Sequence, residues 1–358
     1  MNQDNGCNEA DCGSSCDCGC SGCGPVVEES QFSKDMQALY DAGKTADMMA
    51  ACSKQLAVEP ENSEAYFWRG VVAAVANNFE QAIADYSKAI ELNSRKAVYY
   101  SYRGSAYAML EDIKNAVMDY SQAMFYDPKD WMNYANRGVL YLNNSMFEHA
   151  IDDFSKALEL EPADMASYVN RGDASAARNL YSTAIADYNK VIERFPEEPT
   201  VLIKRGQAYY EIGLIEEALA DYNKIIELEP ENMQAIANRA SIYMGQERTS
   251  EAVADFTRVI EADPSDDRPY FFRGIAYAAQ KNFDAAIADF TRAVELNPDN
   301  VLAHHNKALC CELQQRTAEA IIAYKELIMR ANPESPETAH AKERLQALEQ
   351  EADGTQLQ

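Results

Sequence analysis

A block of 34 residues recurs along this chain from Glu29 to Glu334, without insertion or deletion. The same residue types fall at the same offsets in seven consecutive blocks between Ser63 and Asn300. A fixed period of this length is typical of stacked helical repeats, in which each block packs mainly on its neighbours. We therefore expect nine tandem repeats, at residues 29–62, 63–96, 97–130, 131–164, 165–198, 199–232, 233–266, 267–300 and 301–334.

The pattern inside each block is helical. In the fourth block Tyr134, Gly138 and Tyr141 recur at i, i+4 and i+7. The second half of the block repeats this spacing from Ala150 through Phe154, and a polar Asn-Asn-Ser stretch lies between the halves. This periodicity predicts two amphipathic helices joined by a turn. Each block is therefore expected to be a helix-turn-helix hairpin.

Two small positions recur with the blocks. On the first helix they are Gly70, Gly104, Gly138, Gly172, Gly206, Ala240, Gly274 and Ala308; on the second they are Ala82, Ala116, Ala150, Ala184, Ala218, Ala252, Ala286 and Ala320. A glycine inside a helix costs about 0.5–1 kcal/mol relative to alanine. Its recurrence at one offset indicates that the two helices approach too closely there for a larger side chain.

The two ends of the chain differ from the blocks. Residues 1–28 contain six cysteines among Gly, Ser, Asp and Asn, with almost nothing apolar to bury, so we expect a disordered Cys-rich tail. After the last block, Ser335 and Pro336 form a helix start signal. We expect a capping helix over residues 335–352, with one apolar edge, and a frayed end at residues 353–358.

These residues resemble the tetratricopeptide repeat family. Two blocks show the resemblance best: Tyr66, Gly70, Phe79, Ala82, Tyr86 and Ala89 in one, and Tyr270, Gly274, Tyr277, Phe283, Ala286, Phe290, Ala293 and Pro298 in another. The resemblance implies an all-α, right-handed superhelical solenoid. The first block departs from the pattern, with Met36 and Met48 at the small positions. The last departs at Cys311 and Thr317.

An arginine and an aspartate also recur together in the second to eighth blocks. They are Arg69, Arg103, Arg137, Arg171, Arg205, Arg239 and Arg273, with Asp85, Asp119, Asp153, Asp187, Asp221, Asp255 and Asp289. Many members of the family carry Leu at the arginine position. Matched occurrence indicates ion pairs that join helices; a row of ligand-binding arginines is the alternative. The sequence leaves open whether each pair lies within one block or between two.

In this family the concave face is lined by first-helix side chains, and the resemblance implies a peptide-binding groove there. By offset, the apolar part would be Phe67, Val71, Val139, Val169, Ile203, Tyr210, Phe271, Ile275 and Leu309, and we expect Phe67, Phe271 and Ile275 to be exposed. Asn136, Asn170, Asn238 and Asn306 resemble part of an asparagine ladder that holds peptide backbones. The alternative is that these amides are simply solvated. The clamp for a terminal carboxylate in chaperone-binding relatives is not recognisable, so chaperone C-termini are not expected partners.

The charge balance excludes some partner classes. The chain has 32 Lys and Arg against 58 Asp and Glu, a formal charge of -26. Nucleic acids and anionic membrane surfaces are bound by clustered cations, so neither is expected as a partner. No run of about 18 apolar residues predicts a membrane span, and no secretory signal is recognisable at Met1. We therefore expect a cytoplasmic protein.

The cysteines of the tail are candidate metal ligands. Six of them fall within 17 residues: Cys7, Cys12, Cys16, Cys18, Cys20 and Cys23. Thiolates favour zinc or copper(I), and a flexible glycine-rich segment can arrange four of them around one ion. The alternatives are a tail that is unliganded or adventitiously oxidised, or one that is acylated or disulfide-bonded.

Catalytic residues are not indicated. No phosphate loop, nucleophile elbow or carboxylate dyad occurs. His305 with Cys310 or Cys311 is a conceivable nucleophile pair, but structural roles suit these residues better. The sequence therefore predicts a non-catalytic scaffold that binds a peptide or protein segment. The alternatives are a metal-binding protein that acts through its tail, and an assembly or oligomerisation factor.

Overall fold

The computed structural model of the chain describes residues 30–355, with the backbone alone for residues 352–355. Within this range it contains nineteen α-helices and no strand. The described chain divides into two compact units after Pro128, and each unit is described by itself. The Cys-rich segment predicted at residues 1–28 lies outside the described residues.

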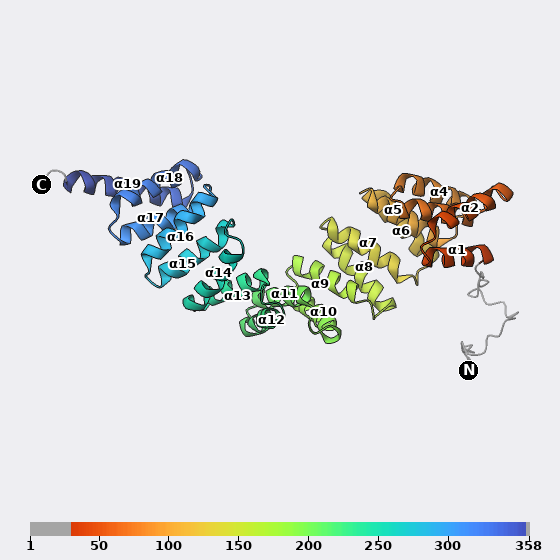
Figure 1. Cartoon of the computed structure of the whole chain (residues 1–358), viewed down its shortest axis with the longest axis horizontal. Helices are drawn as coiled ribbons and strands as arrows, with labels where there is room; N and C mark the ends of the chain where they lie inside the picture. The colour runs from red at the N-terminus through yellow and green to blue at the C-terminus, as the bar shows by residue number, and fades with distance from the viewer. Residues whose placement is uncertain (1–29, 356–358) are drawn as a thin grey trace, which may run out of the picture. The chain divides into compact units, whose positions relative to one another are not determined.

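The first unit contains three consecutive helix pairs (Figure 1). They are α1 (Gln31–Asp41) with α2 (Thr45–Val58), α3 (Ser63–Val75) with α4 (Phe79–Leu92), and α5 (Ala97–Met109) with α6 (Ile113–Tyr126). Each helix contacts its partner in the pair, and α2 and α4 also contact the first helix of the next pair. Consecutive hairpins are therefore stacked.

The second unit continues the same arrangement through six pairs and a last helix. The pairs are α7 (Trp131–Asn143) with α8 (Phe147–Leu160), α9 (Met165–Ala177) with α10 (Tyr181–Arg194), α11 (Pro199–Glu211) with α12 (Ile215–Leu228), α13 (Met233–Gly245) with α14 (Thr249–Ala262), α15 (Asp267–Ala279) with α16 (Phe283–Leu296), and α17 (Val301–Leu313) with α18 (Thr317–Arg330). The last helix is α19 (Pro336–Thr355).

Six first helices carry a glycine at the small position, and five of these glycines lie against an aromatic ring of the second helix. A Cβ atom added at Gly138 would lie 2.9 Å from Cε1 of Phe154, and one added at Gly172 would lie 2.6 Å from Cε1 of Tyr188. Only Gly104 has its nearest such contact elsewhere, at 3.3 Å from Cβ of Asp119. The close approach inferred from the sequence is therefore present, but it is mainly an approach of backbone to ring.

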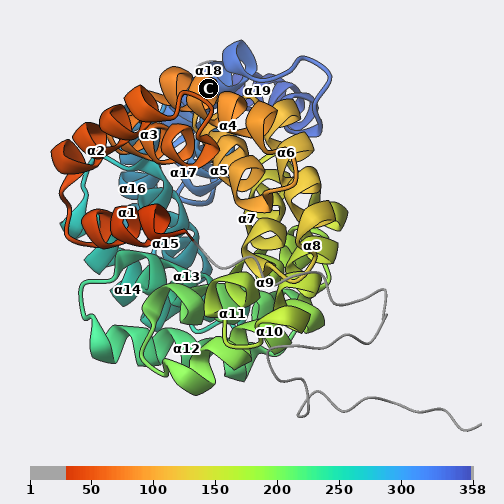
Figure 2. The same cartoon turned by 90° about the vertical axis from the view of Figure 1, so that its right-hand side faces the viewer.

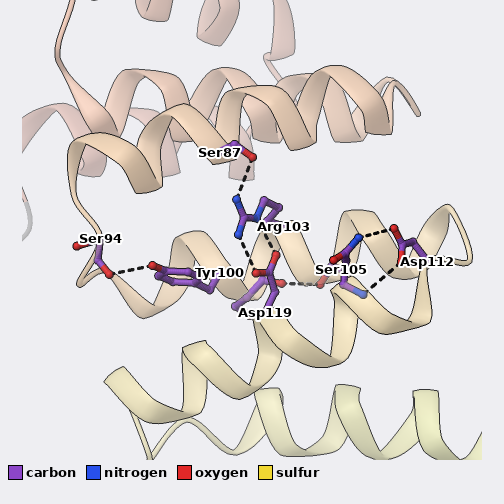
Figure 3. Close-up of polar contacts among 9 residues, drawn as sticks. Ser87, Ser94, Tyr100, Arg103, Ser105, Asp112 and Asp119 are labelled. Atoms are coloured by element: carbon purple, nitrogen blue, oxygen red, sulfur yellow. Dashed lines mark hydrogen bonds and ion pairs between the residues drawn. The ribbon is translucent and has the colours of Figure 1, made fainter.

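The recurring ion pairs lie within hairpins. In the third hairpin Nε and Nη2 of Arg103 donate to the two oxygens of Asp119 at 2.7 and 2.8 Å (Figure 3). The third nitrogen, Nη1, donates to Ser87 on α4 of the preceding hairpin at 2.9 Å. The Arg103 guanidinium also lies over the ring of Tyr100, 5.8 Å from its centroid. One arginine therefore joins three helices, and it does so both within and between hairpins.

The same three-way bond recurs in the second unit. Arg171, Arg205, Arg239 and Arg273 each hold the aspartate of their own hairpin with two bonds. The remaining nitrogen of each donates to the preceding hairpin, at Ser155, Asn189, Asn223 and Thr257 respectively. Two-pronged bonds between a guanidinium and a carboxylate fix geometry as well as adding energy. We call each such arginine with its partners a staple.

The last helix closes the C-terminal end of the second unit. Its start is the predicted one, because the Ser335 hydroxyl accepts a hydrogen bond from the backbone nitrogen of Thr338 at 3.2 Å. Ala341 and Leu348 are buried against the last hairpin. The predicted end at residue 352 is too early: the helix continues to Thr355. No proline follows Glu349, and residues 349–352 are good helix formers, so nothing stops the helix there.

The described residues therefore form an all-α helical-repeat solenoid in each unit, as the sequence predicts. The right-handed superhelix stays a prediction. None of the helices described is both long and apolar enough to cross a membrane.

Candidate functional site

A cavity of about 640 Å³ lies in the second unit, between α13, α14 and α15. These three helices follow one another in Figure 1 and are neighbours in Figure 2 as well, and α14 contacts both of the others. The walls are first-helix side chains of two consecutive hairpins, with Phe256 and Val259 of α14 at the base. This is the face on which the family resemblance places a groove, and we call the cavity the α13–α15 groove.

An exposed aromatic ring forms one wall of this groove. Phe272 of α15 is 41% exposed, although a phenylalanine side chain favours burial. Its ring stacks on Phe256, with centroids 5.8 Å apart and planes 15° apart. Phe271 packs edge-on against Phe272, with ring centroids 5.3 Å apart. Two neighbours therefore hold the ring in place while one of its faces stays accessible.

Polar side chains of α13 form the opposite wall. Gln234, Asn238 and Ser241 follow at i, i+4 and i+7, so they share one face of the helix, and all three line the groove. Asn238 is half-buried on this face of the helix. The next residue, Arg239, forms a staple with Asp255 and Asn223. The staple therefore fixes the position of α13, the helix that presents these polar groups.

The rim of the groove carries two carboxylates and one guanidinium. Hydrogen bonds from Arg268 hold the pKa of the Asp266 carboxyl below its usual value. Hydrogen bonds from Ser265 lower the pKa of Asp263 in the same way. Both groups are therefore ionised at neutral pH. Arg268 pairs with Asp266 at 2.7 Å, which leaves Asp263 as the excess negative charge.

A second, smaller cavity of about 310 Å³ lies between α9, α10 and α11. At its centre the Asp173 carboxylate accepts hydrogen bonds from Lys204 at 2.5 Å and from the Tyr188 hydroxyl at 2.9 Å. Lys204 stands at an offset where neighbouring hairpins carry asparagine. Because the polar groups here bond to one another, this cavity has fewer groups to offer a ligand than the α13–α15 groove.

The predicted groove residues fall into three groups. Phe67, Val71 and Ile203 are buried; Val139, Val169, Asn170, Asn238, Phe271, Ile275, Asn306 and Leu309 are half-buried; Asn136 and Tyr210 are exposed. Phe67 and Val71 belong to the first unit and the others to the second. Of the whole set, Asn238 lines the α13–α15 groove.

The expected exposure of the apolar residues is wrong at Phe67, which is 6% exposed. Its ring stacks on Tyr99 of the next hairpin at 5.1 Å, and Tyr102 packs against it at 5.0 Å. Phe271 and Ile275 are packed against the core of the last hairpins. These side chains lie in the contact between hairpins, because the following first helix covers them.

The exposed aromatic residue is Phe272, one position after the predicted Phe271. Phe272 stands at the offset that carries Asn238 in the preceding hairpin. Aromatic residues at this offset are exposed at Tyr102 and Phe272 but buried at Trp68, so the polar character of the offset in neighbouring blocks is a partial signal of exposure.

The cysteines of the last hairpin lie in its core. Cys310 and Cys311 are buried, and burial raises the pKa of the Cys310 thiol to about 11 and that of Cys311 in the same direction. Both are therefore neutral thiols at physiological pH. In residues 30–351, no cluster of three or more His, Cys, Asp or Glu side chains is arranged to hold a metal ion. The six tail cysteines lie outside the described residues.

Family models described as tetratricopeptide repeat match residues 63–96 and 134–164, and residues 203–267 and 271–336. Together these matches cover more than half of the chain. The chain belongs to the tetratricopeptide repeat (TPR) family. No curated protein matches it.

Solved TPR structures resemble the chain in fold. The C-terminal part of a TPR repeat-containing protein from Cytophaga hutchinsonii is 19% identical, with a TM-score of 0.58 over 66% of this chain and 97% of its own. YrrB, described as a TPR protein with an unusual peptide-binding site, is 24% identical, with a TM-score of 0.49 over 52% of this chain and 96% of its own. The first likeness shows the TPR solenoid fold.

Proposed function

We propose that this TPR protein is a non-catalytic scaffold that binds an extended peptide segment of another protein in the α13–α15 groove. The observation that carries the proposal is the exposed, stacked ring of Phe272 opposite a row of polar side chains. A concave site with one apolar anchor and a few placed polar groups is the usual form of a ligand site. Membership of the TPR family supports the same conclusion.

The two walls suit the two parts of a peptide. Gln234 and Asn238 carry amides, each of which can donate to a carbonyl and accept from an N–H of an extended backbone. Phe272 offers a flat apolar face to one side chain. The negative charge at Asp263 favours a lysine or arginine beside that side chain.

The staples provide the rigidity that such a site needs. Arg239 and Arg273 directly follow Asn238 and Phe272, and each is bonded to its own hairpin and to the preceding one. Because the staples fix the two walls before a peptide binds, the protein loses less conformational entropy on binding, and the affinity is higher.

Peptide selection from a random displayed library, followed by calorimetry with the selected peptides, tests the proposal. Aromatic anchors commonly contribute 2 kcal/mol or more to binding, so Phe272→Ala should weaken binding by about thirtyfold. Asn238→Ala should weaken it less. The matched control is Phe195→Ala, because Phe195 is 48% exposed but lies outside the groove.

Unchanged affinity of the selected peptides for both groove variants would refute the proposal. Equal weakening by Phe195→Ala would refute it as well, because the effect would then not depend on the groove. Thermal unfolding of each variant separates loss of binding from loss of fold.

A further inference from the structure

Two outward-facing positions, seven residues apart, recur on the second helix of the hairpins. In six helices the later position is an exposed glutamate: Glu91, Glu159, Glu193, Glu227, Glu261 and Glu295. The earlier position in the same helices is an exposed alanine or aspartate: Ala84, Asp152, Ala186, Ala220, Ala254 and Ala288. Small and charged residues are the ordinary choice for a solvated face.

Helix α6 breaks this pattern with two large apolar side chains. Met118 stands at the earlier position and is 56% exposed; Phe125 stands at the later one and is 75% exposed. The two lie about two turns apart on one face of the helix. Helix α18 has Ile322 and Met329 at the same offsets. The other hairpins show that the fold does not require apolar residues there.

The outer face of α6 also lacks the negative charge of its counterparts. The one acidic residue of α6 is Asp119, which is buried in its pair with Arg103. Lys88 pairs with Glu91 at 2.8 Å on the outer face of α4; the matching offsets of α6 hold Gln122 and Phe125. On a chain of formal charge -26, this face is uncharged apart from the exposed Lys114.

The apolar face of α18 differs in its surroundings. Lys325 pairs with Glu349 of α19 at 2.8 Å, and Arg330 pairs with Glu326 at 3.0 Å. Charged pairs therefore flank Ile322 and Met329, whereas α6 itself carries no exposed carboxylate. This contrast makes α18 the matched control for α6.

We propose that two copies of this chain associate through their α6 helices, packed antiparallel around a two-fold axis at Gln122. Met118 and Phe125 lie nearly equidistant from Gln122 along the helix, so an antiparallel partner places Phe125 against Met118 and Met118 against Phe125. Such a self-complementary contact is the common form of a symmetric dimer.

The charge distribution favours a second copy of this chain as the partner of the α6 face. Two molecules of formal charge -26 repel, and the repulsion is smallest where neither presents a carboxylate. Salt screens repulsion between the remaining charges but leaves apolar contact intact, because the Debye length is only about 8 Å at physiological ionic strength. Association should therefore strengthen as salt is raised. Binding of an acidic partner through Lys114 would instead weaken as the salt concentration is raised.

Sedimentation equilibrium of the full-length chain over a concentration series, under reducing conditions, measures the association. One helix pair buries less surface than a standard interface, so a concentration-dependent dimer is expected. The variant Met118→Ala/Gln122→Lys/Phe125→Glu gives α6 the residue types found at these offsets on its counterparts, so it should fold normally and remain monomeric. Ile322→Ala/Met329→Glu should dimerise like the wild type.

Gln122 provides a test of the two-fold axis. Gln122→Glu and Gln122→Lys each bring two like charges together at the axis, so both should weaken the dimer, by about tenfold at low salt. A face that binds a different surface would respond in opposite directions to the two substitutions. A wild-type chain that is monomeric throughout, a triple variant that associates as strongly as the wild type, or opposite responses at Gln122 would each overturn the proposal.

Discussion

The staple at Arg171 allows a quantitative test of how the hairpins are held together. Arg171 donates two hydrogen bonds to Asp187, at 2.9 and 2.7 Å, and a third to Ser155 of the preceding hairpin at 3.1 Å. The Asp187 side chain is 5% exposed and the Arg171 side chain 22% exposed. When its partner is removed, the Arg171 guanidinium can therefore be hydrated more readily than the Asp187 carboxylate.

This difference predicts unequal costs. Arg171→Met leaves the buried Asp187 carboxylate without its ion-pair partner, and breaking a buried pair in this way costs about 3–5 kcal/mol of unfolding free energy. Asp187→Ala leaves a partly exposed guanidinium that still bonds to Ser155, so it should cost about 2 kcal/mol, the strength of a charged hydrogen bond. The double variant removes both charges and should cost only about 2 kcal/mol, mainly lost packing of the arginine stem. The coupling free energy is then about 3–5 kcal/mol.

Urea denaturation followed by far-ultraviolet circular dichroism gives these free energies of unfolding for the four proteins. The last hairpin offers a natural precedent, because it carries Lys307 and Ala323 at the two offsets and is fully formed. Additive single substitutions would show that the pair contributes no mutual stabilisation. A larger cost for Asp187→Ala than for Arg171→Met would contradict the reasoning from exposure.

Three further outcomes are expected. Gly138→Leu should lower the unfolding free energy by about 1–3 kcal/mol because it overpacks the hairpin against Phe154. Gly138→Ala should cost less, because two other hairpins carry alanine at this position. Equal thermal midpoints for the two variants would contradict this reasoning. Burial and the neighbouring His340 ring, 5.2 Å away, hold the pKa of His305 below its usual 6.5, so docking of the last helix should be fully stable above that pH and weaken as pH falls below it. Hydrogen exchange of the last helix measures this, and His305→Phe should remove the dependence. Deleting residues 1–28 should leave the melting temperature unchanged and remove any zinc or copper carried by the reduced protein; metal retained by the truncated chain would show that the ligands lie elsewhere.

The repeat period made most of the fold predictable. Spacing alone indicated two helices per block, because apolar residues recur at i, i+4 and i+7, and it indicated a close approach at the glycine positions. It did not show what each glycine approaches. The ring beside Gly172 belongs to Tyr188, one turn after the recurring Ala184 of the second helix.

The binding site was less predictable, because exposure depends on how far a neighbouring hairpin overlaps. Trp68 and Phe272 stand at the same offset of their first helices, yet Trp68 is 6% exposed and bonds to Ser33 of the preceding hairpin, whereas Phe272 is 41% exposed. Such coverage is a property of two hairpins together and is not visible in either block alone. The staples were partly predictable: matched occurrence indicated the pairs, but the third bond, such as that from Arg103 to Ser87, needed the structure.

Site-specific photo-crosslinking tests the central claim, that the α13–α15 groove holds a peptide. A photoreactive phenylalanine analogue at Ser241, inside the groove, is compared with the same analogue at Ala254, on the outer face of α14. With a selected peptide bound, crosslinking should occur from position 241 and be lost when Phe272→Ala is added, and position 254 should give none. Equal crosslinking from both positions, or crosslinking at 241 that is insensitive to Phe272→Ala, would contradict the account.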